Sequence, residues 1–452
     1  MRIVIIGDGK VGVTLTERLS KEGHDLVVID QNKRVLQEAA NQYDVLTVHG
    51  NGATMTAQRE ADVGRSDLMI AATSADEVNL LCCLLARKLG VPRTIARVRS
   101  PEYTEQLPFL KEDLGLSMTI NPEYTAAMEI LNLLRFPAAL KRDRFSRGRA
   151  EIIELKLSPD SFLCGRKLYE LMQLTKIQVL ICAVERGETV MIPSGDFQLS
   201  ANDNIYVTGA SRNLAALVQK MSIAERKIRS VILIGGSRIA FYLAMALKGE
   251  CAVKILEIDE ERCKELAASL PHARVVHADG TQPETLISEG LAEADAVVTL
   301  TDIDEVNIVL SMYATRFGVY KVITKINRIE YNDLALKMGV NSIVSPKSIS
   351  CNEIVRYVRA MNNTSEGGVL TLHRIVNEKV EALEFSVPAN APYLEVPLKD
   401  LRIKQGILIA CIHRKGKIII PGGSDFLRSG DSVIVVAKSD ELYSSLNEIF
   451  KQ

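Results

Sequence analysis

The chain has 452 residues, 47% of them hydrophobic, which is enough for several packed domains. Lys and Arg total 55 against 56 Asp and Glu, and this balance excludes the basic excess typical of nucleic-acid-binding proteins. The eight cysteines form no CxxC or zinc-type spacing, which predicts a reducing cytosolic compartment and no metal site. We see no secretory signal and no apolar run near the roughly 18 residues of a membrane helix.

The first part of the chain alternates short apolar strands with helical patterns. The predicted strands span residues 2–6, 25–30, 44–48, 68–72 and 94–98, and helices are predicted at 11–21 and 33–41. The strands are apolar almost throughout instead of alternating with polar residues. This pattern predicts a parallel sheet that is covered by helices on both faces.

A glycine-rich turn joins the first strand to the first helix. It consists of Gly7, Asp8, Gly9, Lys10, Val11 and Gly12. The first glycine permits a tight turn, the second lets the backbone approach a pyrophosphate, and the third allows close packing of helix on sheet. The second strand ends in Asp30, at about the 20-residue spacing expected for an acid that binds ribose hydroxyls. Asp30 favours NAD(H) over NADP(H), and the ribose of ATP would also suit it.

Polar residues follow the fourth and fifth strands, at the edge where open α/β sheets bind ligands. We expect Thr73 and Ser74 to contact a ligand there, and Asp76 to cap the helix that follows. Arg97 and Arg99 follow the fifth strand. Either they neutralise phosphate groups or they face solvent.

A helix is predicted over residues 122–136, since Pro122 suits a helix start and Pro137 ends the pattern. Its broad apolar surface fits packing on its own domain and contact with a partner helix equally well. The charged stretch 141–149 is predicted to be a linker. Beyond it, predicted strands at 152–157, 178–185, 189–192 and 204–208 indicate a small β-rich lobe.

The second half of the chain repeats the first at an offset of 228 residues, over most of its length. The segment 304–307 repeats 76–79 residue for residue. We therefore predict two tandem Rossmann-like, doubly wound parallel-sheet domains, each followed by a small β-rich α+β lobe. The predicted domains span residues 1–123, 143–227, 229–348 and 368–452.

The second glycine turn is less complete. Gly235 remains, whereas Ser237 and Ala240 replace the second and third glycines, and Asp259 is predicted to end the next strand as the ribose-binding acid. The second copy either binds nothing and serves packing, or binds a mononucleotide. His49 and His277 are repeat equivalents and are predicted to be structural.

No Ser–His–Asp set, HExxH motif or activated cysteine is apparent, so we expect binding and no catalysis. The alternatives are an NAD-dependent oxidoreductase and a nucleotide sensor that serves a different transporter or an anion pathway.

The whole chain resembles the regulator-of-potassium-conductance (RCK) domain family, most specifically in Gly7 to Gly12 with Asp30 and in the segments 73–79 and 96–103. The resemblance implies NAD(H), often with ATP or ADP, as ligands, and Arg97 as a phosphate contact. It also implies a ring of eight domains from four chains beneath a membrane-embedded potassium translocator. The chain would then be cytoplasmic and peripheral on the inner face of the membrane.

Two departures from the family pattern concern the ligand sites. The turn from Gly235 to Ala240 has fewer glycines than is usual in the family. Gly50-Asn51-Gly52 lacks the acidic residue common at its middle position, whereas the second half keeps Asp279 there.

Overall fold

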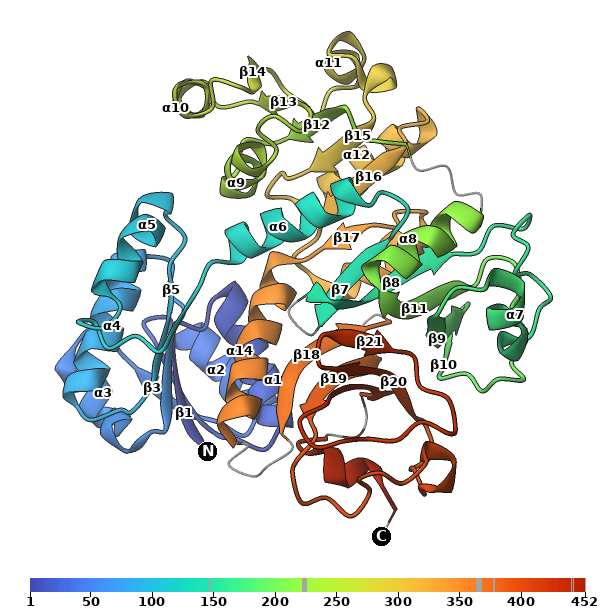
Figure 1. Ribbon diagram of the computed structural model, residues 1–452. Helices are drawn as coiled ribbons and strands as arrows, with labels where there is room; N and C mark the ends of the chain where they lie inside the picture. Colours follow the sequence, from blue (N-terminus) through green and yellow to red (C-terminus); the bar gives the residue numbers. More distant parts are fainter. Residues whose placement is uncertain are drawn as a thin grey trace. The chain divides into compact units, whose positions relative to one another are not determined.

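The computed structural model in Figure 1 describes residues 1–145, 148–221, 226–362, 368–376, 379–439, 441 and 443–451. The chain forms two compact units. The first contains Met1–Ala126 and Ser345–Tyr357, and the second contains Ala127–Val344 and Val358–Gln452. Among the described residues, no helix is long and apolar enough to span a membrane.

The first unit contains a six-stranded sheet with the strand order β3-β2-β1-β4-β5-β6. All neighbouring strands in it are parallel. The strands are β1 (Arg2–Ile6), β2 (Asp25–Asp30), β3 (Leu46–His49), β4 (Leu68–Ala71), β5 (Thr94–Arg97) and β6 (Met118–Ile120). This order is that of a Rossmann sheet, and it confirms the predicted fold class.

Helices connect these strands and cover the apolar sheet. They are α1 (Lys10–Lys21), α2 (Lys33–Gln42), α3 (Met55–Glu60), α4 (Asp76–Lys88), α5 (Pro101–Leu110) and the first turn of α6 (Pro122–Arg135). All four residues of β4 are buried, as expected for a strand covered on both faces. The order of the strands reverses between β1 and β4, and this is where such sheets bind ligands.

A helix from the second half of the sequence completes the first unit. Residues Ser345–Tyr357, mostly in α14 (Pro346–Asn362), lie beside α1 (Figure 1). The buried Arg18 side chain donates to the Ser348 carbonyl at 3.4 Å and also bonds the side chain of Asn352. Thr14, four residues before Arg18 and on the same face of α1, is buried as well, so this helix carries polar residues on a covered face.

The second unit contains a second parallel sheet of the same type, with the order β14-β13-β12-β15-β16-β17. Its strands are β12 (Ser230–Ile234), β13 (Ala252–Glu257), β14 (Arg274–His277), β15 (Ala296–Thr299), β16 (Lys321–Lys325) and β17 (Ile343–Val344). Its helices are α9 (Arg238–Ala246), α10 (Glu260–Ser269), α11 (Pro283–Ser288), α12 (Asp304–Arg316) and α13 (Asn332–Lys337).

Two antiparallel five-stranded sheets form the β-rich lobes, with the orders β10-β9-β11-β8-β7 and β18-β19-β22-β20-β21. The first contains β7 (Lys141–Phe145), β8 (Ala150–Lys156), β9 (Val179–Arg186), β10 (Thr189–Met191) and β11 (Asn204–Ala210), with helices α7 (Leu171–Thr175) and α8 (Ser211–Lys220). The second contains β18 (Val369–Ile375), β19 (Val380–Ser386), β20 (Ile407–Arg414), β21 (Lys417–Ile419) and β22 (Ser432–Lys438). Phe145, Cys182, Ile375 and Cys411 belong to one apolar cluster that both sheets share.

The predicted linker at 141–149 is wrong in its first part, because β7 pairs antiparallel with β8. Residues 146–147 lie outside the described part of the chain. The charges of β7 have partners in the second unit: Arg142 Nε lies 2.8 Å from Glu151 Oε2, and Asp143 Oδ1 lies 3.0 Å from His373 Nδ1. Charged residues can therefore form a strand here, because Arg142 pairs with a carboxylate and Asp143 also lies 3.8 Å from the Lys141 ammonium.

The apolar residues of α6 are buried within the chain, including Ile130, Leu131, Leu133 and Leu134. Beyond the helix, the Lys321 ammonium of β16 donates to the Ala139 carbonyl at 2.7 Å. Arg135 pairs with Glu250, which follows α9. This end of the helix therefore contacts the second parallel-sheet domain of the same chain. That contact was neither of the two alternatives, which were packing on its own domain and contact with a partner helix.

Candidate nucleotide-binding site

A cavity of about 490 Å³ lies at the carboxyl ends of β1, β2, β4 and β5 in the first unit. Six of the predicted residues line it: Gly7, Gly9, Asp30, Thr73, Ser74 and Arg97. Arg99 and the Gly50-Asn51-Gly52 loop complete the polar part of the wall. Among the described residues that line the cavity there is no histidine, lysine, cysteine or tyrosine.

The surroundings of the three glycines in the first turn differ, and so does the effect that a Cβ would have at each. Gly7 has a φ of +89°, and a Cβ there would lie 2.8 Å from the Thr73 nitrogen. A Cβ on Gly12 would lie 2.1 Å from the Gly7 carbonyl oxygen, so only glycine fits without movement of the backbone. No atom lies within 4 Å of the corresponding point at Gly9. Gly9 also lines the cavity, and a glycine there leaves room for the close approach of a phosphate.

Asp30 is fixed by the backbone around it. Its Oδ2 accepts a hydrogen bond from the Asp8 N–H at 2.8 Å, and its Oδ1 accepts one from the Asn32 N–H at 2.7 Å. Each carboxylate oxygen has a further lone pair, and Asp30 lines the cavity. The carboxylate is therefore held in place and can still accept from a ribose hydroxyl.

Asp8, Val11 and Gly12 of the turn do not line the cavity. Asp8 is buried, and its Oδ1 accepts from the Thr16 hydroxyl at 3.1 Å. Burial raises the pKa of the Asp8 carboxyl to about 6, with a further increase from the charge of Asp30 and a decrease from the Thr16 hydrogen bond. Val11 is buried, and the side chain of Lys10 lies outside the described residues.

Asn79 joins the ends of β4 and β5, a role that sequence reasoning missed. Its Oδ1 accepts from the Thr73 N–H at 2.8 Å and from the Thr73 hydroxyl at 2.7 Å. Its Nδ2 donates to the Arg97 carbonyl at 2.8 Å. The side chain is fully buried. Asn79 thus positions two residues of the cavity wall, and its exact repetition at Asn307 was the available signal.

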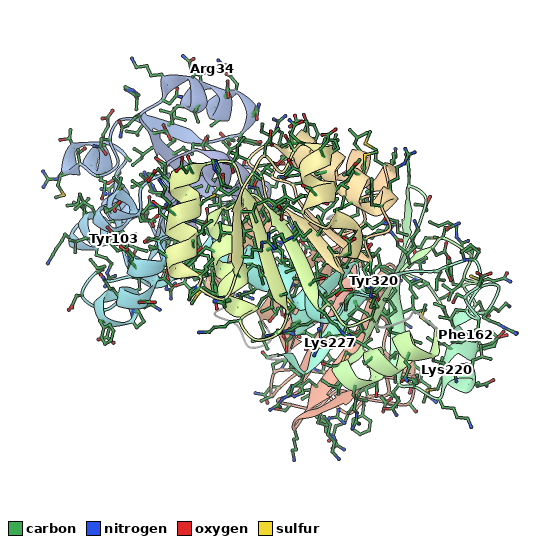
Figure 2. All side chains as sticks on the ribbon, turned by 90° about the horizontal axis from the view of Figure 1, so that it is seen from above. Arg34, Tyr103, Phe162, Lys220, Lys227 and Tyr320 are labelled. Atoms are coloured by element: carbon green, nitrogen blue, oxygen red, sulfur yellow. The ribbon has the colours of Figure 1, made fainter. Side chains whose placement is uncertain are left out.

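Asp76 does not cap α4, contrary to the prediction, because the capping position is Ala75 and carries no side-chain bond. Asp76 Oδ2 instead accepts from the N–H groups of Arg99 and Ser100, each at 2.8 Å. The next residue, Glu77, accepts a hydrogen bond at 2.6 Å from the hydroxyl of Tyr103 in α5, which is labelled in Figure 2. The repeated segment 76–79 therefore holds the chain that leaves β5.

Arg97 and Arg99 bring positive charge to the cavity wall. Arg97 Nη2 lies 3.6 Å from Glu123 Oε1, and Arg99 Nη1 lies 3.9 Å from the same oxygen. Arg99 also donates to the Ser74 carbonyl, and its Nε lies 3.6 Å from Asp76 Oδ1. Both arginines thus line the cavity, each beside at least one carboxylate.

The second copy of the turn uses a different acid from the predicted one. Strand β13 ends at Glu257, and the Glu257 Oε2 accepts from the Gly236 N–H at 2.6 Å, as Asp30 does from Asp8. The prediction that Asp259 ends this strand is wrong. Asp259 caps α10, and its side chain accepts from the Arg262 N–H at 2.8 Å. The path from turn to strand end is one residue shorter here, so the offset of 228 maps Asp30 onto Ile258, which lies between the two acids.

Other positions of the second copy also differ in chemistry. Arg262 Nε donates to the Gly236 carbonyl at 2.8 Å, so a guanidinium lies at the turn. Lys325 stands at the position of Arg97 and pairs with Asp302 at 3.3 Å. Asn327 replaces Arg99, and its side chain bonds Asp304. The two predicted structural histidines are alike, since His49 and His277 each contact a backbone carbonyl at 3.0 Å.

Solved structures identify the class of fold. The RCK domain of GsuK has a TM-score of 0.63 with this chain at 19% identity, covering 97% of this chain and 92% of that one. A structure of the GsuK channel bound to NAD gives a TM-score of 0.63 at 20% identity, covering 97% of this chain and 77% of that one. At these identities the likeness concerns the fold alone, which is that of tandem RCK domains.

Sequence relatives identify the family. The TrkA-N domain model matches residues 3–122 and 231–346, and the TrkA-C domain model matches 152–222 and 382–450. The chain is 31% identical to Trk system potassium uptake protein TrkA homolog 2 of Methanosarcina mazei, with all of both chains covered. It is 33% identical to the TrkA homolog of Archaeoglobus fulgidus, again with full coverage of both. The chain belongs to the Trk system potassium uptake protein TrkA family.

Proposed function

We propose that the protein is a nucleotide-binding regulatory subunit of a potassium-uptake system, and that it is not an enzyme. Its partner would be an integral-membrane potassium-translocating subunit of the TrkH/TrkG kind, and four chains would form a ring on the inner face of the membrane. The observation that carries the proposal is the cavity of the first unit, with its glycine turn, a fixed Asp30 and two arginines. Family membership supports the link to potassium uptake.

The ligand that best suits this cavity is NAD(H), with ATP or ADP as further candidates. Asp30 would bind the ribose hydroxyls, and the backbone of Gly7 and Gly9 would lie against the phosphates. Thr73, Ser74 and Arg97 would complete the contacts, while Asp8, Lys10, Val11 and Gly12 keep the turn in shape. For the second copy we propose Gly235 and Glu257, in place of Asp259, as the corresponding pair.

Regulation requires that the nucleotide binds one state of the protein more tightly than another. A ligand with equal affinity for two ring states would shift nothing, however tightly it bound. The expected readout is therefore a difference in potassium uptake by the translocator with NADH, NAD, ATP or ADP present. Equal uptake under all conditions, despite nucleotide binding, would contradict the regulatory role.

The first test is calorimetric titration of the full chain with NADH, NAD, ATP and ADP. Asp30→Asn is the informative variant, because it removes the charge and keeps an acceptor for the backbone N–H of Asp8. Glu257→Gln is its matched control in the second copy. One nucleotide per chain, lost in Asp30→Asn and kept in Glu257→Gln, is the expected result. Two per chain, with one lost in each variant, would add a second functional site. Absence of binding would exclude the proposal.

A further inference from the structure

Glu123 places a carboxylate behind the two arginines that line the cavity. It lies in the first turn of α6, and its Oε1 is 3.6 Å from Arg97 Nη2 and 3.9 Å from Arg99 Nη1. All three side chains are less than a fifth exposed. Glu123 Oε2 is buried and accepts no hydrogen bond from any residue that the structure describes. Charge therefore holds this carboxylate more than hydrogen bonding does.

The other carboxylate near these arginines, that of Asp76, is held differently. It accepts two backbone N–H groups, from Arg99 and Ser100, and these bonds fix its position. The four side chains Arg97, Arg99, Asp76 and Glu123 balance in formal charge. A phosphate group that enters the cavity adds negative charge to a balanced site with little access to screening water. Glu123 is the carboxylate with the fewest bonds to lose.

We propose that Glu123 is an internal counter-ion of the nucleotide site, which pairs with Arg97 and Arg99 before a nucleotide binds and yields them to its phosphates. This inference rests on the proposed nucleotide binding and adds a specificity determinant to it. Glu123 lowers the affinity for every phosphate-bearing ligand. It does so most for the ligand with the most charge, and thus favours a dinucleotide over a triphosphate.

The same exchange of partners couples phosphate binding to the first turn of α6, where Glu123 lies. Residues 122–126 of this helix belong to the first unit, and the helix continues into the second. Because coupling between two interactions is reciprocal, a phosphate that takes the arginines weakens their hold on the first turn of α6. We therefore expect faster hydrogen exchange at residues 124–126 with NADH or ATP bound, and no change with adenosine.

The experiment is calorimetric titration of the full chain with NADH, ATP and adenosine in buffer with EDTA. Glu123→Gln removes the charge and keeps the shape. Glu105→Gln on the exposed side of α5 is the matched control, with the same change in net charge. We expect Glu123→Gln to bind NADH about threefold and ATP about tenfold more tightly, because each phosphate charge loses a repulsive neighbour. Adenosine affinity should stay the same, and Glu105→Gln should resemble the wild type.

Each outcome decides a different point. Unchanged or weaker binding of both phosphate ligands by a folded Glu123→Gln overturns the inference and leaves the proposed function intact. Equal gains for NADH and ATP overturn the specificity part. Should the variant fail to fold, hydrogen exchange of the wild type still decides, because unchanged rates at 124–126 contradict the exchange of partners. A wild type that binds no nucleotide removes both the inference and the proposed function.

Discussion

The two halves of the chain share one scaffold and differ in the charges placed on it. Asn79 and Asn307 make the same set of bonds, and Asp76 and Asp304 each hold the backbone that leaves the fifth strand. At the position of Arg97 the second half has Lys325, and Asn327 replaces Arg99. The Glu123 position holds Lys347 in the second half, which reverses the charge.

This difference separates residues that build the fold from residues that bind. Bonds to backbone atoms at the strand ends recur in both halves, because both sheets need them. The cations and the carboxylate near the cavity change between the halves, as we expect of residues that serve a ligand. Substitutions at paired positions can therefore test which role each residue has.

The largest effect is expected for the buried asparagines. Asn79→Ala and Asn307→Ala each leave several buried backbone and hydroxyl groups without a partner, at a cost of about 2–4 kcal/mol in unfolding free energy. Urea unfolding should show similar losses for both. Nucleotide titration should show lost binding in Asn79→Ala alone. Similar loss of nucleotide affinity in Asn307→Ala would mean that the halves are not independent.

The third glycine of the turn gives the next largest difference. Gly12→Ala places a Cβ 2.1 Å from the Gly7 carbonyl oxygen, and the required backbone shift should cost about 1–3 kcal/mol and weaken nucleotide binding. The second half already has Ala240, and Ala240→Gly should cost only roughly 0.5–1 kcal/mol through backbone entropy. Thermal unfolding of both variants measures this. A tolerated Gly12→Ala with normal binding would show that the first turn can relax.

A smaller, pH-dependent effect belongs to the first turn alone, because Gly236 in the second half has no carboxyl group. The pKa of Asp8 is raised from 3.8 to about 6 in the fold. Because its pKa is higher in the folded than in the unfolded protein, Asp8 contributes stability only when it is protonated, at a pH below its unfolded pKa. The unfolding free energy should therefore fall as the pH rises from about 4 to about 6. Asp8→Asn should remove this slope and stabilise the protein at pH 7.5 by about 1–2 kcal/mol, allowing for partial solvent screening. Urea unfolding at pH 4 and pH 7.5 measures it, and an unchanged slope would mean that Asp8 is not its source.

The smallest effect should come from the paired tyrosines. The hydroxyls of Tyr103 and Tyr331 donate to Glu77 and Glu305 at 2.6 and 3.0 Å, on the exposed side of both domains. Exposed hydrogen bonds contribute little because water replaces them. Tyr103→Phe and Tyr331→Phe should each leave the melting temperature nearly unchanged. A clear loss of melting temperature in only one variant would mean that this tyrosine is buried in an assembly of several chains, although it is exposed in the single chain.

Much of the fold could be predicted from local sequence signals. The apolar strands and the glycine turn gave the strand bounds of β1 and β2 without error, since period and turn chemistry are local. Pro122 gave the start of α6 for the same reason. Strand β6 was missed because three residues carry too weak a pattern.

Contacts between distant segments could not be predicted. A charge run such as Lys141–Phe145 looks like a linker until its partners Glu151 and His373 are known. The choice of Asp259 over Glu257 failed because the offset of 228 falls on Ile258, with an acid on each side, and only the strand end in the structure decides between them. In the cavity, Asp30 and Arg97 were predicted from fold rules, whereas Glu123 was not, because nothing local connects a residue of α6 with β5.

The place of α14 has a consequence for how the chain is made. The polar face of α1, including Arg18, is covered by residues Ser345–Tyr357, which leave the ribosome only after the first antiparallel lobe and all six strands of the second parallel sheet. At about 5–20 residues per second this delay is on the order of ten seconds or more. The N-terminal sheet can form early, but it waits with one helix uncovered, and synthesis of the second half is what completes the first.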